Sequence, residues 1–350
     1  MSVSSDCQST DDFINPKSQT LKNGLPVCKF LYRPLKLISL LFPSFIIFAK
    51  GPIFKIIPFI KKIIEIQKFK PDYIVTGPFP TTISFYTIIL SRLINPHPKI
   101  LLIPCFHFTD PIFRKKILIN TLKKADFVWS LTDYETQTYI KEFKINPKRI
   151  LTLGAGINPD LLLSASPTTD TQNLLYLGSF AAHKGIALLI DSFTSLSKKY
   201  PHLSLTLAGH PTLYSPLIEN KIKNLPKTVG SKIKIIYNFN SETLTLLLDQ
   251  CFTLVLPSTQ ESYGLVLLEA MSRKKPVIAT DIPALSEMIK KSGSGLLFKK
   301  DSLSSLNNTV EKLLINPNLR QKLGQPGYEY VKNNCTWDKI IGNLCQNIYP

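Results

Sequence analysis

Two glutamates, Glu261 and Glu269, stand eight positions apart in the stretch Pro257 to Ala284. The residues between them predict a turn followed by a helix, because ESYG precedes the apolar run LVLLEAMSR. A helix N-terminus presents unpaired N–H groups and a partial positive charge, which suit a diphosphate. Glu269, further along this helix, is placed to accept hydrogen bonds from a ribose diol. Glu261 precedes the helix, where it can face a sugar ring or a developing cationic centre.

A second candidate site lies in LLYLGSFAAHKGIALLIDSF, residues 174–193. The pattern predicts a strand, a turn at Gly178 and a helix that opens at Lys184 and Gly185. A lysine at a helix start beside a glycine turn is placed to neutralise phosphate oxygens. The segment therefore predicts a phosphate contact that would complement the first site.

Short apolar runs alternate with helical patterns along most of the chain. The runs are 73–77, 99–106, 126–132 and 149–156, then 173–180, 203–209, 232–239, 251–258, 276–281 and 295–298. Strands that are apolar on both faces and separated by helices are typical of parallel sheets covered on two sides. Ligands of such sheets bind at the carboxyl ends of the strands. An α/β protein with two sheets is therefore expected.

The domain boundaries follow from composition. Residues 164–173, SASPTTDTQN, are polar and lack apolar periodicity, which is typical of a linker. We expect an N-terminal Rossmann-like domain over 23–163 and a C-terminal Rossmann-like domain over 174–330. Residues 331–350 are predicted to form a helix that packs back on the first domain. Residues 1–22 are polar, have no basic stretch before an apolar core, and are expected to form a disordered extension.

The chain is basic, with 42 Lys+Arg against 24 Asp+Glu and a net charge of +18, which favours anionic partners. Residues 27–70 combine nine basic residues and one acid with long apolar runs. The run Leu37 to Ala49 contains Pro43 and is shorter than the roughly 20 residues of a spanning helix. Two interpretations stay open for 27–70: an interfacial segment on an anionic membrane, or an ordinary helix with a basic outer face.

Cysteine and histidine patterns predict neither disulfides nor a metal site. The six cysteines form no CxxC pair and the five histidines do not cluster, so a reduced, cytoplasmic location is expected, on the inner face of the membrane if 27–70 binds lipid. Nucleic acid is not expected as a partner, because basic and aromatic residues do not form a recognisable binding module.

Taken together, these segments resemble the signature of the family-4 retaining glycosyltransferases, which have the GT-B fold of two Rossmann-like domains facing a cleft. The matching residues are Pro257, Ser258, Glu261, Gly264, Glu269, Ala270, Pro276 to Ala279 and Pro283. A looser resemblance extends from about residue 70 to 345. It implies a metal-independent enzyme that stabilises the leaving diphosphate with a helix dipole and a lysine, in agreement with the lack of an Asp-x-Asp pair.

The resemblance also implies roles for single residues. Glu261 and His107, which follows the strand KILLIPCF, are expected to be catalytic. The expected donor-binding residues are Gly178, Ser179, Lys184, Ser262, Tyr263, Gly264, Leu265 and Glu269. Family members usually carry an arginine where Ser179 stands, so one cationic contact is missing. They also open with a strand, a Gly-Gly turn and a helix that residues 1–30 lack, so the first domain is predicted to be shortened at its N-terminus.

The expected function is that of a hexosyltransferase-type glycosyltransferase. It would move a sugar from a nucleotide-diphosphate sugar, with retention at the anomeric carbon, to a hydroxyl of a lipid-linked or polysaccharide acceptor. No cofactor is expected beyond this co-substrate. Two alternatives stay open: a non-catalytic paralogue that binds nucleotide sugar, and a GT-B nucleotide-sugar epimerase, which would carry more acids and histidines in its cleft.

Overall fold

The computed structural model describes residues 19–20, 26–27, 67–68, 70–79, 82–106, 111–162 and 172–348. These residues divide into two compact units at Thr152 and Leu153. The division falls before the predicted linker 164–173, most of which lies outside the described residues, as do most of the predicted extension 1–22 and of the basic segment 27–70. A short antiparallel pair, β1 (Gln19–Thr20) and β2 (Pro26–Val27), belongs to this early part of the chain.

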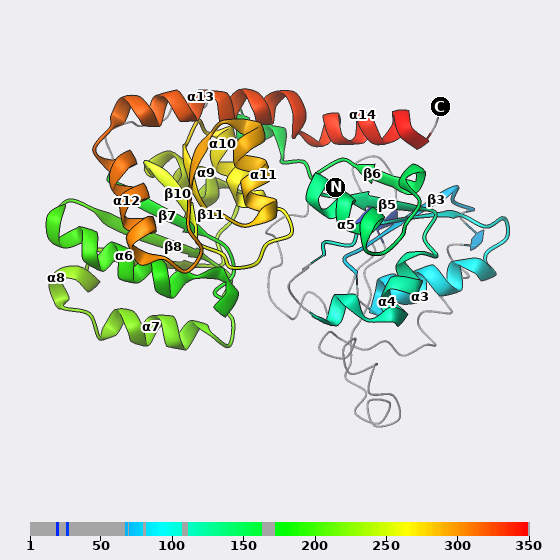
Figure 1. Ribbon diagram of the computed structural model, residues 1–350, viewed down its shortest axis with the longest axis horizontal. Coiled ribbons are helices and arrows are strands. Elements are labelled where there is room, and N and C mark those ends of the chain that lie inside the picture. Colours follow the sequence, from blue (N-terminus) through cyan, green and yellow to red (C-terminus); the bar gives the residue numbers. More distant parts are fainter. Residues whose placement is uncertain are drawn as a thin grey trace. The chain divides into compact units, whose positions relative to one another are not determined.

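The first unit, up to Thr152, contains a four-stranded parallel sheet in the order β3-β4-β5-β6. Figure 1 shows α3 and α4 side by side on one face of this sheet. The elements are β3 (Tyr73–Thr76), α3 (Thr82–Leu90), β4 (Lys99–Leu102), α4 (Lys116–Leu122), β5 (Phe127–Ser130), α5 (Asp133–Lys141) and β6 (Ile150–Thr152), with 3-10 turns η2 (Ser91–Leu93), η3 (Pro111–Arg114) and η4 (Pro147–Arg149). Its core includes Leu102, Phe106, Val128 and Tyr139.

The second unit, from Leu153, contains a six-stranded parallel sheet in the order β12-β11-β10-β7-β8-β9. Its strands are β7 (Asn173–Leu177), β8 (Ser204–Gly209), β9 (Ile233–Tyr237), β10 (Thr253–Leu256), β11 (Val277–Thr280) and β12 (Gly295–Phe298). From β7 the chain builds the sheet first in one direction and then, from β10, in the other. The boundary between β7 and β10 is thus the topological switch point, beside which ligands of such sheets bind.

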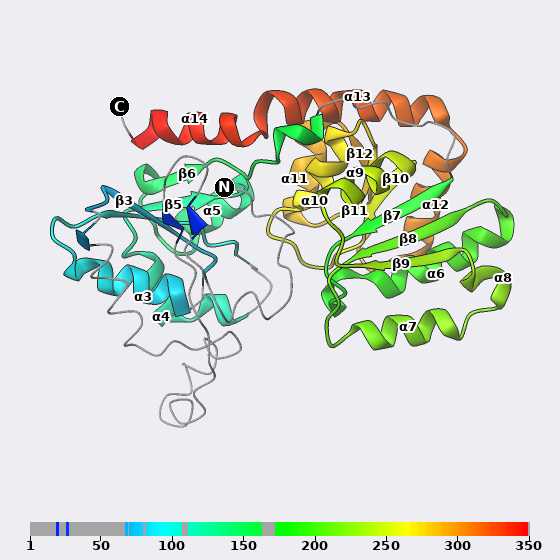
Figure 2. The same cartoon turned by 180° about the vertical axis from the view of Figure 1, so that it is seen from behind.

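Helices cover both faces of the second sheet, with α6, α7 and α12 on one side and α10, α11 and α13 on the other (Figures 1 and 2). The helices and 3-10 turns are η5 (Pro159–Leu162), η6 (Ala182–Lys184), α6 (Ile186–Lys199), α7 (Ser215–Lys223), α8 (Lys227–Gly230), α9 (Ser241–Gln250), α10 (Leu265–Ser272), α11 (Pro283–Ser292), α12 (Leu303–Leu314), α13 (Pro317–Asn334) and α14 (Trp337–Ile348). The predicted helix at 331–350 spans the end of α13 and α14, and its packing on the first domain stays a prediction.

The central strands β10 and β11 of the second sheet are fully buried, as their apolar sequences predict. All four residues of β10 and all four of β11 are buried, because helices cover both faces. Every apolar run named from the sequence contains one of the strands β3 to β12. The prediction of two parallel α/β sheets is therefore confirmed.

The loops after β7 and β10 approach each other so closely that a glycine is required. Gly185 has φ +69°, and a Cβ added there would lie 2.0 Å from the carbonyl oxygen of Pro257. The neighbouring turn is equally tight, since a Cβ on Gly209 would lie 1.7 Å from the carbonyl oxygen of Gly178. Backbone atoms cannot move aside as a side-chain end can, so these contacts fix the distance between the loops.

We predict that Gly185→Ala lowers the free energy of unfolding by about 3 kcal/mol, from the positive φ and the overlap with Pro257. The matched control is Gly342→Ala in α14, where an added Cβ has nothing within 4 Å. Alanine there should raise the free energy of unfolding by about 0.5–1 kcal/mol through helix propensity. Urea unfolding of both variants checks this; equal changes would contradict the tight approach of the two loops.

Within the described residues, no helix is both long enough and apolar enough to span a membrane.

Candidate active site

The two sequence motifs meet at the switch point of the second sheet. The loop after β7 carries Gly178 to Gly185, and the loop after β10 carries Pro257 to Gly264. Backbone bonding joins them, because the N–H of Thr259 donates to the carbonyl of His183 over 2.8 Å. The hydroxyl of Thr259 reaches the same carbonyl at 3.2 Å. The structure therefore brings together the two segments that the sequence assigned to donor binding.

Lys184 and Glu261 form an ion pair between these loops. The Nζ of Lys184 lies 2.5 Å from Oε1 of Glu261, and the hydroxyl of Ser258 donates to the same oxygen over 3.0 Å. The two side chains are only 17% and 9% exposed. In a site of this burial the pair is weakly screened, so an incoming diphosphate would compete with Glu261 for the ammonium.

The N-terminus of α10 presents its first amides without a capping side chain. Gly264 has φ +93° and ψ +51°, and no side chain accepts a hydrogen bond at this end. A Cβ on Gly264 would lie 2.7 Å from Leu285, so glycine is needed here as well. The N–H groups from Leu265 onward thus belong to a helix start that can bind an anion. Ser262 is partly exposed on the same loop.

The turn after β7 is held in place by the phenol of Tyr176. Gly178 has φ +145°, and a Cβ there would lie 2.9 Å from the hydroxyl of Tyr176. That hydroxyl donates to the carbonyl oxygen of Ser179 over 2.8 Å. Burial, and then the charge of Glu261, raise the pKa of Tyr176 well above its ordinary value, so the phenol keeps its proton. The Ser179 turn is therefore fixed by its backbone, and serine adds no positive charge to it.

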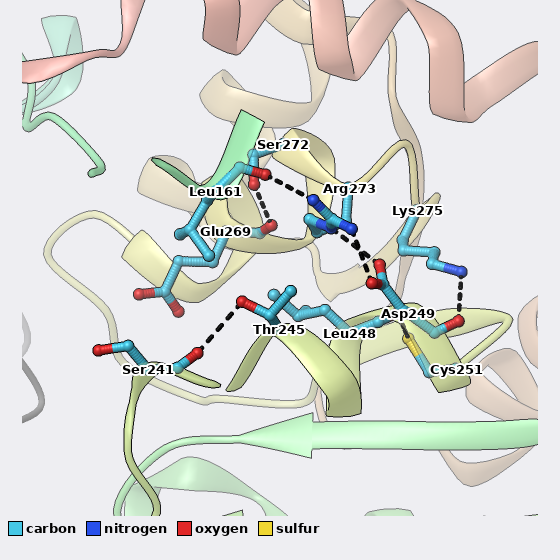
Figure 3. Close-up of polar contacts among 10 residues, drawn as sticks. All are labelled: Leu161, Ser241, Thr245, Leu248, Asp249, Cys251, Glu269, Ser272, Arg273 and Lys275. Atoms are coloured by element: carbon cyan, nitrogen blue, oxygen red, sulfur yellow. Dashed lines mark hydrogen bonds and ion pairs between the residues drawn. The ribbon is translucent and has the colours of Figure 1, made fainter. Parts of the chain in front are cut away.

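Glu269 is a half-buried residue on α10, and Figure 3 shows its side chain. Burial raises its pKa from 4.5 to about 7, and no charged group contributes to this shift. Among the described residues no side chain or amide hydrogen-bonds to the carboxylate; the bond from the hydroxyl of Ser272 goes to the backbone carbonyl of Glu269. A desolvated acceptor without an internal partner suits a ligand diol.

Tyr263 points toward a different part of the second unit from the one expected. A Cβ on Gly154 would lie 2.6 Å from its hydroxyl, which hydrogen-bonds with the backbone of Ala155 and the side chain of Cys335. Burial raises the pKa of Tyr263, so its hydroxyl stays protonated. Its phenol links the β10–α10 loop to the segment just after Leu153. Any contact of Tyr263 with a nucleotide-sugar donor would therefore be made by its backbone.

His107 lies outside the described residues, which end at Phe106 on this side. Sequence reasoning missed a buried carboxylate that contacts Phe106. Oε1 of Glu135 accepts from the N–H of Phe106 at 3.2 Å, and Oε2 accepts from the N–H of Leu131 at 2.6 Å. Burial raises the pKa of Glu135, while bonds from Tyr139 and these amides lower it. The sequence did contain a signal for Glu135, because Thr132 to Glu135, TDYE, fits the capping-box pattern of a helix start. In the structure the hydroxyl of Thr132 caps α5.

No group of three His, Cys, Asp or Glu side chains in the described part of the chain is arranged to hold a metal ion. Metal independence stays a prediction.

Comparison with known proteins finds similarity to glycosyltransferases. Residues 164–330 match the family model described as Glycosyl transferases group 1. An uncharacterized glycosyltransferase of Methanocaldococcus jannaschii is 28% identical over 261 residues, which are 73% of this chain and 68% of that protein. A GDP-mannose:cellobiosyl-diphosphopolyprenol alpha-mannosyltransferase of Xanthomonas oryzae is 24% identical over 173 residues, 49% of this chain and 45% of that one. The chain thus spans from under half to about two thirds of these relatives.

Solved structures agree on the fold. Sucrose-phosphate synthase from Thermosynechococcus elongatus superposes with a TM-score of 0.73 at 19% identity, covering 96% of this chain and 86% of that one. An Anabaena protein solved in complex with UDP gives a TM-score of 0.69 at 15% identity, covering 82% and 80%. The chain thus has the GT-B fold, and its residues 164–330 are similar to the group 1 glycosyltransferases.

The raised pKa of Glu269 gives a pH prediction. Folding favours the protonated carboxyl, so the contribution of Glu269 to stability is most favourable below the unfolded pKa of about 4.3 and is lost as pH rises toward 7. Glu269→Gln never ionises and should be more stable than wild type by about 2–3 kcal/mol at pH 8, with this gain vanishing near pH 4.5. Urea unfolding across that range measures it, with exposed Glu242→Gln as control. A gain independent of pH would show that Glu269 is not desolvated.

Proposed function

We propose that the protein transfers a sugar from a nucleotide-diphosphate sugar, with retention at the anomeric carbon, to a hydroxyl of a lipid-linked or polysaccharide acceptor. The observation that carries the proposal is the meeting of Lys184, the uncapped start of α10 and the loop of Glu261 at the switch point. The Anabaena fold neighbour was solved with UDP, and the Xanthomonas relative is named for a diphosphopolyprenol acceptor, which supports the substrate classes.

The reaction would depend on the leaving diphosphate. Lys184 and the first amides of α10 would neutralise the charge that develops on it, while Glu269 binds the nucleoside through its ribose. When Lys184 turns to the diphosphate, Glu261 is released from its ion pair and becomes available to orient the sugar or stabilise a cationic centre. The role assigned to His107, activation of the acceptor hydroxyl, belongs to the same proposal.

The finer expectations extend to location. A cytoplasmic site of action stays a prediction, and so does the expectation that nucleic acid is not a partner. Purified protein that binds a nucleotide sugar but neither hydrolyses nor transfers it would favour the non-catalytic alternative. Interconversion of two nucleotide sugars without an acceptor would favour the epimerase.

Contact with an anionic membrane is favoured by a basic and apolar surface on the first unit, here called the α3–α4 face. Ile89, Leu93 and Ile117 are exposed there by 37%, 71% and 48%. Exposed cations surround them at Arg92, Lys115, Lys116 and Lys124. The guanidinium of Arg92 donates to the carbonyl of Lys124 over 3.0 Å, so η2 and the end of α4 adjoin. Apolar burial and attraction to lipid phosphates would act together at such a surface.

We predict that a nucleoside diphosphate stabilises the protein. UDP, GDP and ADP should be compared by thermal shift, because a ligand at about 100 times its Kd adds roughly 2.7 kcal/mol. Lys184→Ala and Glu269→Ala should each weaken binding of the best ligand at least about tenfold, through a lost charge-assisted or buried hydrogen bond. Lys221→Ala is the matched control, since its ion pair with Asp191 lies on the surface.

Glu261→Ala should leave this affinity unchanged or raise it, because the ammonium of Lys184 is freed, and should chiefly lower turnover. The site would be misplaced if neither Lys184→Ala nor Glu269→Ala changed the affinity.

We predict that the protein sediments with phosphatidylglycerol-containing vesicles at low salt, and less so at high salt. Leu93→Glu with Ile117→Glu should weaken this binding at least about tenfold, since two exposed apolar side chains are lost to the membrane. Leu217→Glu on α7, a leucine that is 59% exposed, is the matched control. Equal loss in the control, or no sedimentation of the wild type, would refute the α3–α4 face as a membrane surface.

A further inference from the structure

Arg273, which follows the last residue of α10, donates hydrogen bonds to Asp249 and Leu161. It is 3% exposed. Its Nε and Nη2 donate to the two carboxylate oxygens of Asp249 over 2.8 and 2.7 Å, and its Nη1 donates to the carbonyl of Leu161 over 3.0 Å. The partners come from the end of α9 and from η5, far apart in sequence (Figure 3). This two-point contact fixes both the position and the plane of the guanidinium.

Glu269 lies on α10, four residues before Arg273, which caps the C-terminus of this helix. Glutamate and arginine at this spacing and in this order ordinarily attract each other. The attraction should be strong here, because the carboxylate is desolvated. Figure 3 nevertheless shows the Glu269 carboxylate directed away from the guanidinium, and its pKa is raised by burial alone. The arginine that could pair with it is engaged elsewhere.

We propose that Asp249 is a positioning residue of the donor site: with the carbonyl of Leu161 it holds Arg273 away from Glu269, and so leaves the Glu269 carboxylate open to a ligand. The inference rests on the proposed function, in which Glu269 binds the nucleoside. An internal Arg273–Glu269 pair would have to be broken by each incoming ribose, and the affinity would fall accordingly. Asp249 thus acts on the ligand only through the two residues between them.

The arrangement around Asp249 supports a directing role. Its backbone carbonyl accepts from Nζ of Lys275 over 2.8 Å, so the position of Asp249 is itself fixed. Burial lowers the pKa of Lys275, which lies 2% exposed beside it. Replacing the Asp249 carboxylate by an amide would remove the anion that Arg273 contacts at two points, and Glu269 is the acid on the helix that Arg273 caps.

The test needs no ligand. Glutamate labelled with carbon-13 at the carboxyl reports the titration of Glu269 by NMR, and Glu269→Gln identifies its signal. The wild type should titrate with a pKa of about 7. In Asp249→Asn the pKa should fall by at least one unit toward the ordinary range, because Arg273 turns to the carboxylate. In Asp249→Asn with Arg273→Met it should return to about 7. A pKa in Asp249→Asn equal to that of wild type overturns the inference.

A second variant keeps the inference testable if Asp249→Asn does not fold. Arg273→Met alone should leave the pKa of Glu269 near 7, because the guanidinium does not act on it in the native arrangement. A rise of one unit or more would show that Arg273 already stabilises the carboxylate, and would overturn the inference. The predicted return in the double variant also separates positioning from a merely structural role, which would not restore a titration.

Measurement of the affinity for UDP tests whether Asp249 affects ligand binding. Asp249→Asn should weaken binding about tenfold, in proportion to the fall of one pKa unit, and the double variant should recover it. If the pKa shifts as expected but wild type binds neither UDP, GDP nor ADP, the inference about Arg273 holds and the proposed function fails. If wild type binds and the pKa does not shift, the proposed function holds and the inference fails.

Discussion

The close approach of two backbones at the switch point is the constraint on which the donor site depends. Gly185 lies against the carbonyl of Pro257 at a distance that excludes any side chain, and the N–H of Thr259 bonds the carbonyl of His183. These contacts come from neighbouring strands, β7 and β10, whose carboxyl ends meet at the same edge of the sheet. The side chains of Lys184 and Glu261, more than 70 residues apart in sequence, thereby come close enough to form an ion pair.

Two charged side chains of this site are in environments that are electrostatically unfavourable. Among the described residues the Glu269 carboxylate has no hydrogen-bond partner, and the Lys184 ammonium pairs with a glutamate that has its own expected task. Both arrangements lower the stability of the fold relative to a fully satisfied core. They are also what a polyanionic ligand with a diol can relieve, because it brings negative charge to the lysine and donors to the glutamate.

Sequence reasoning identified the strands and the two loops that meet at the switch point, because these depend on local patterns: apolar runs for buried strands, glycines at positive φ, and charged residues at helix starts. The ligand-binding roles of the loop residues stay predictions. Sequence reasoning could not find Ser258 as a partner of Glu261, or Asp249 as the anchor of Arg273, since each contact depends on how loops or helix ends meet in space. Tyr263 shows the same limit, because its phenol turns to Cys335, more than 70 residues further along the chain.

Because position 179 is a serine and not an arginine, one fewer cation is available to neutralise a diphosphate. Tyr176 fixes the Ser179 carbonyl, so the turn keeps its shape without an arginine, but it contributes no cation. Neutralisation would then depend more heavily on Lys184, whose ammonium is paired with Glu261. In the proposed function, binding would require an exchange of anions at one lysine, from carboxylate to phosphate. That exchange would couple donor binding to the release of Glu261, so the glutamate would become available at the sugar only when the diphosphate is in place.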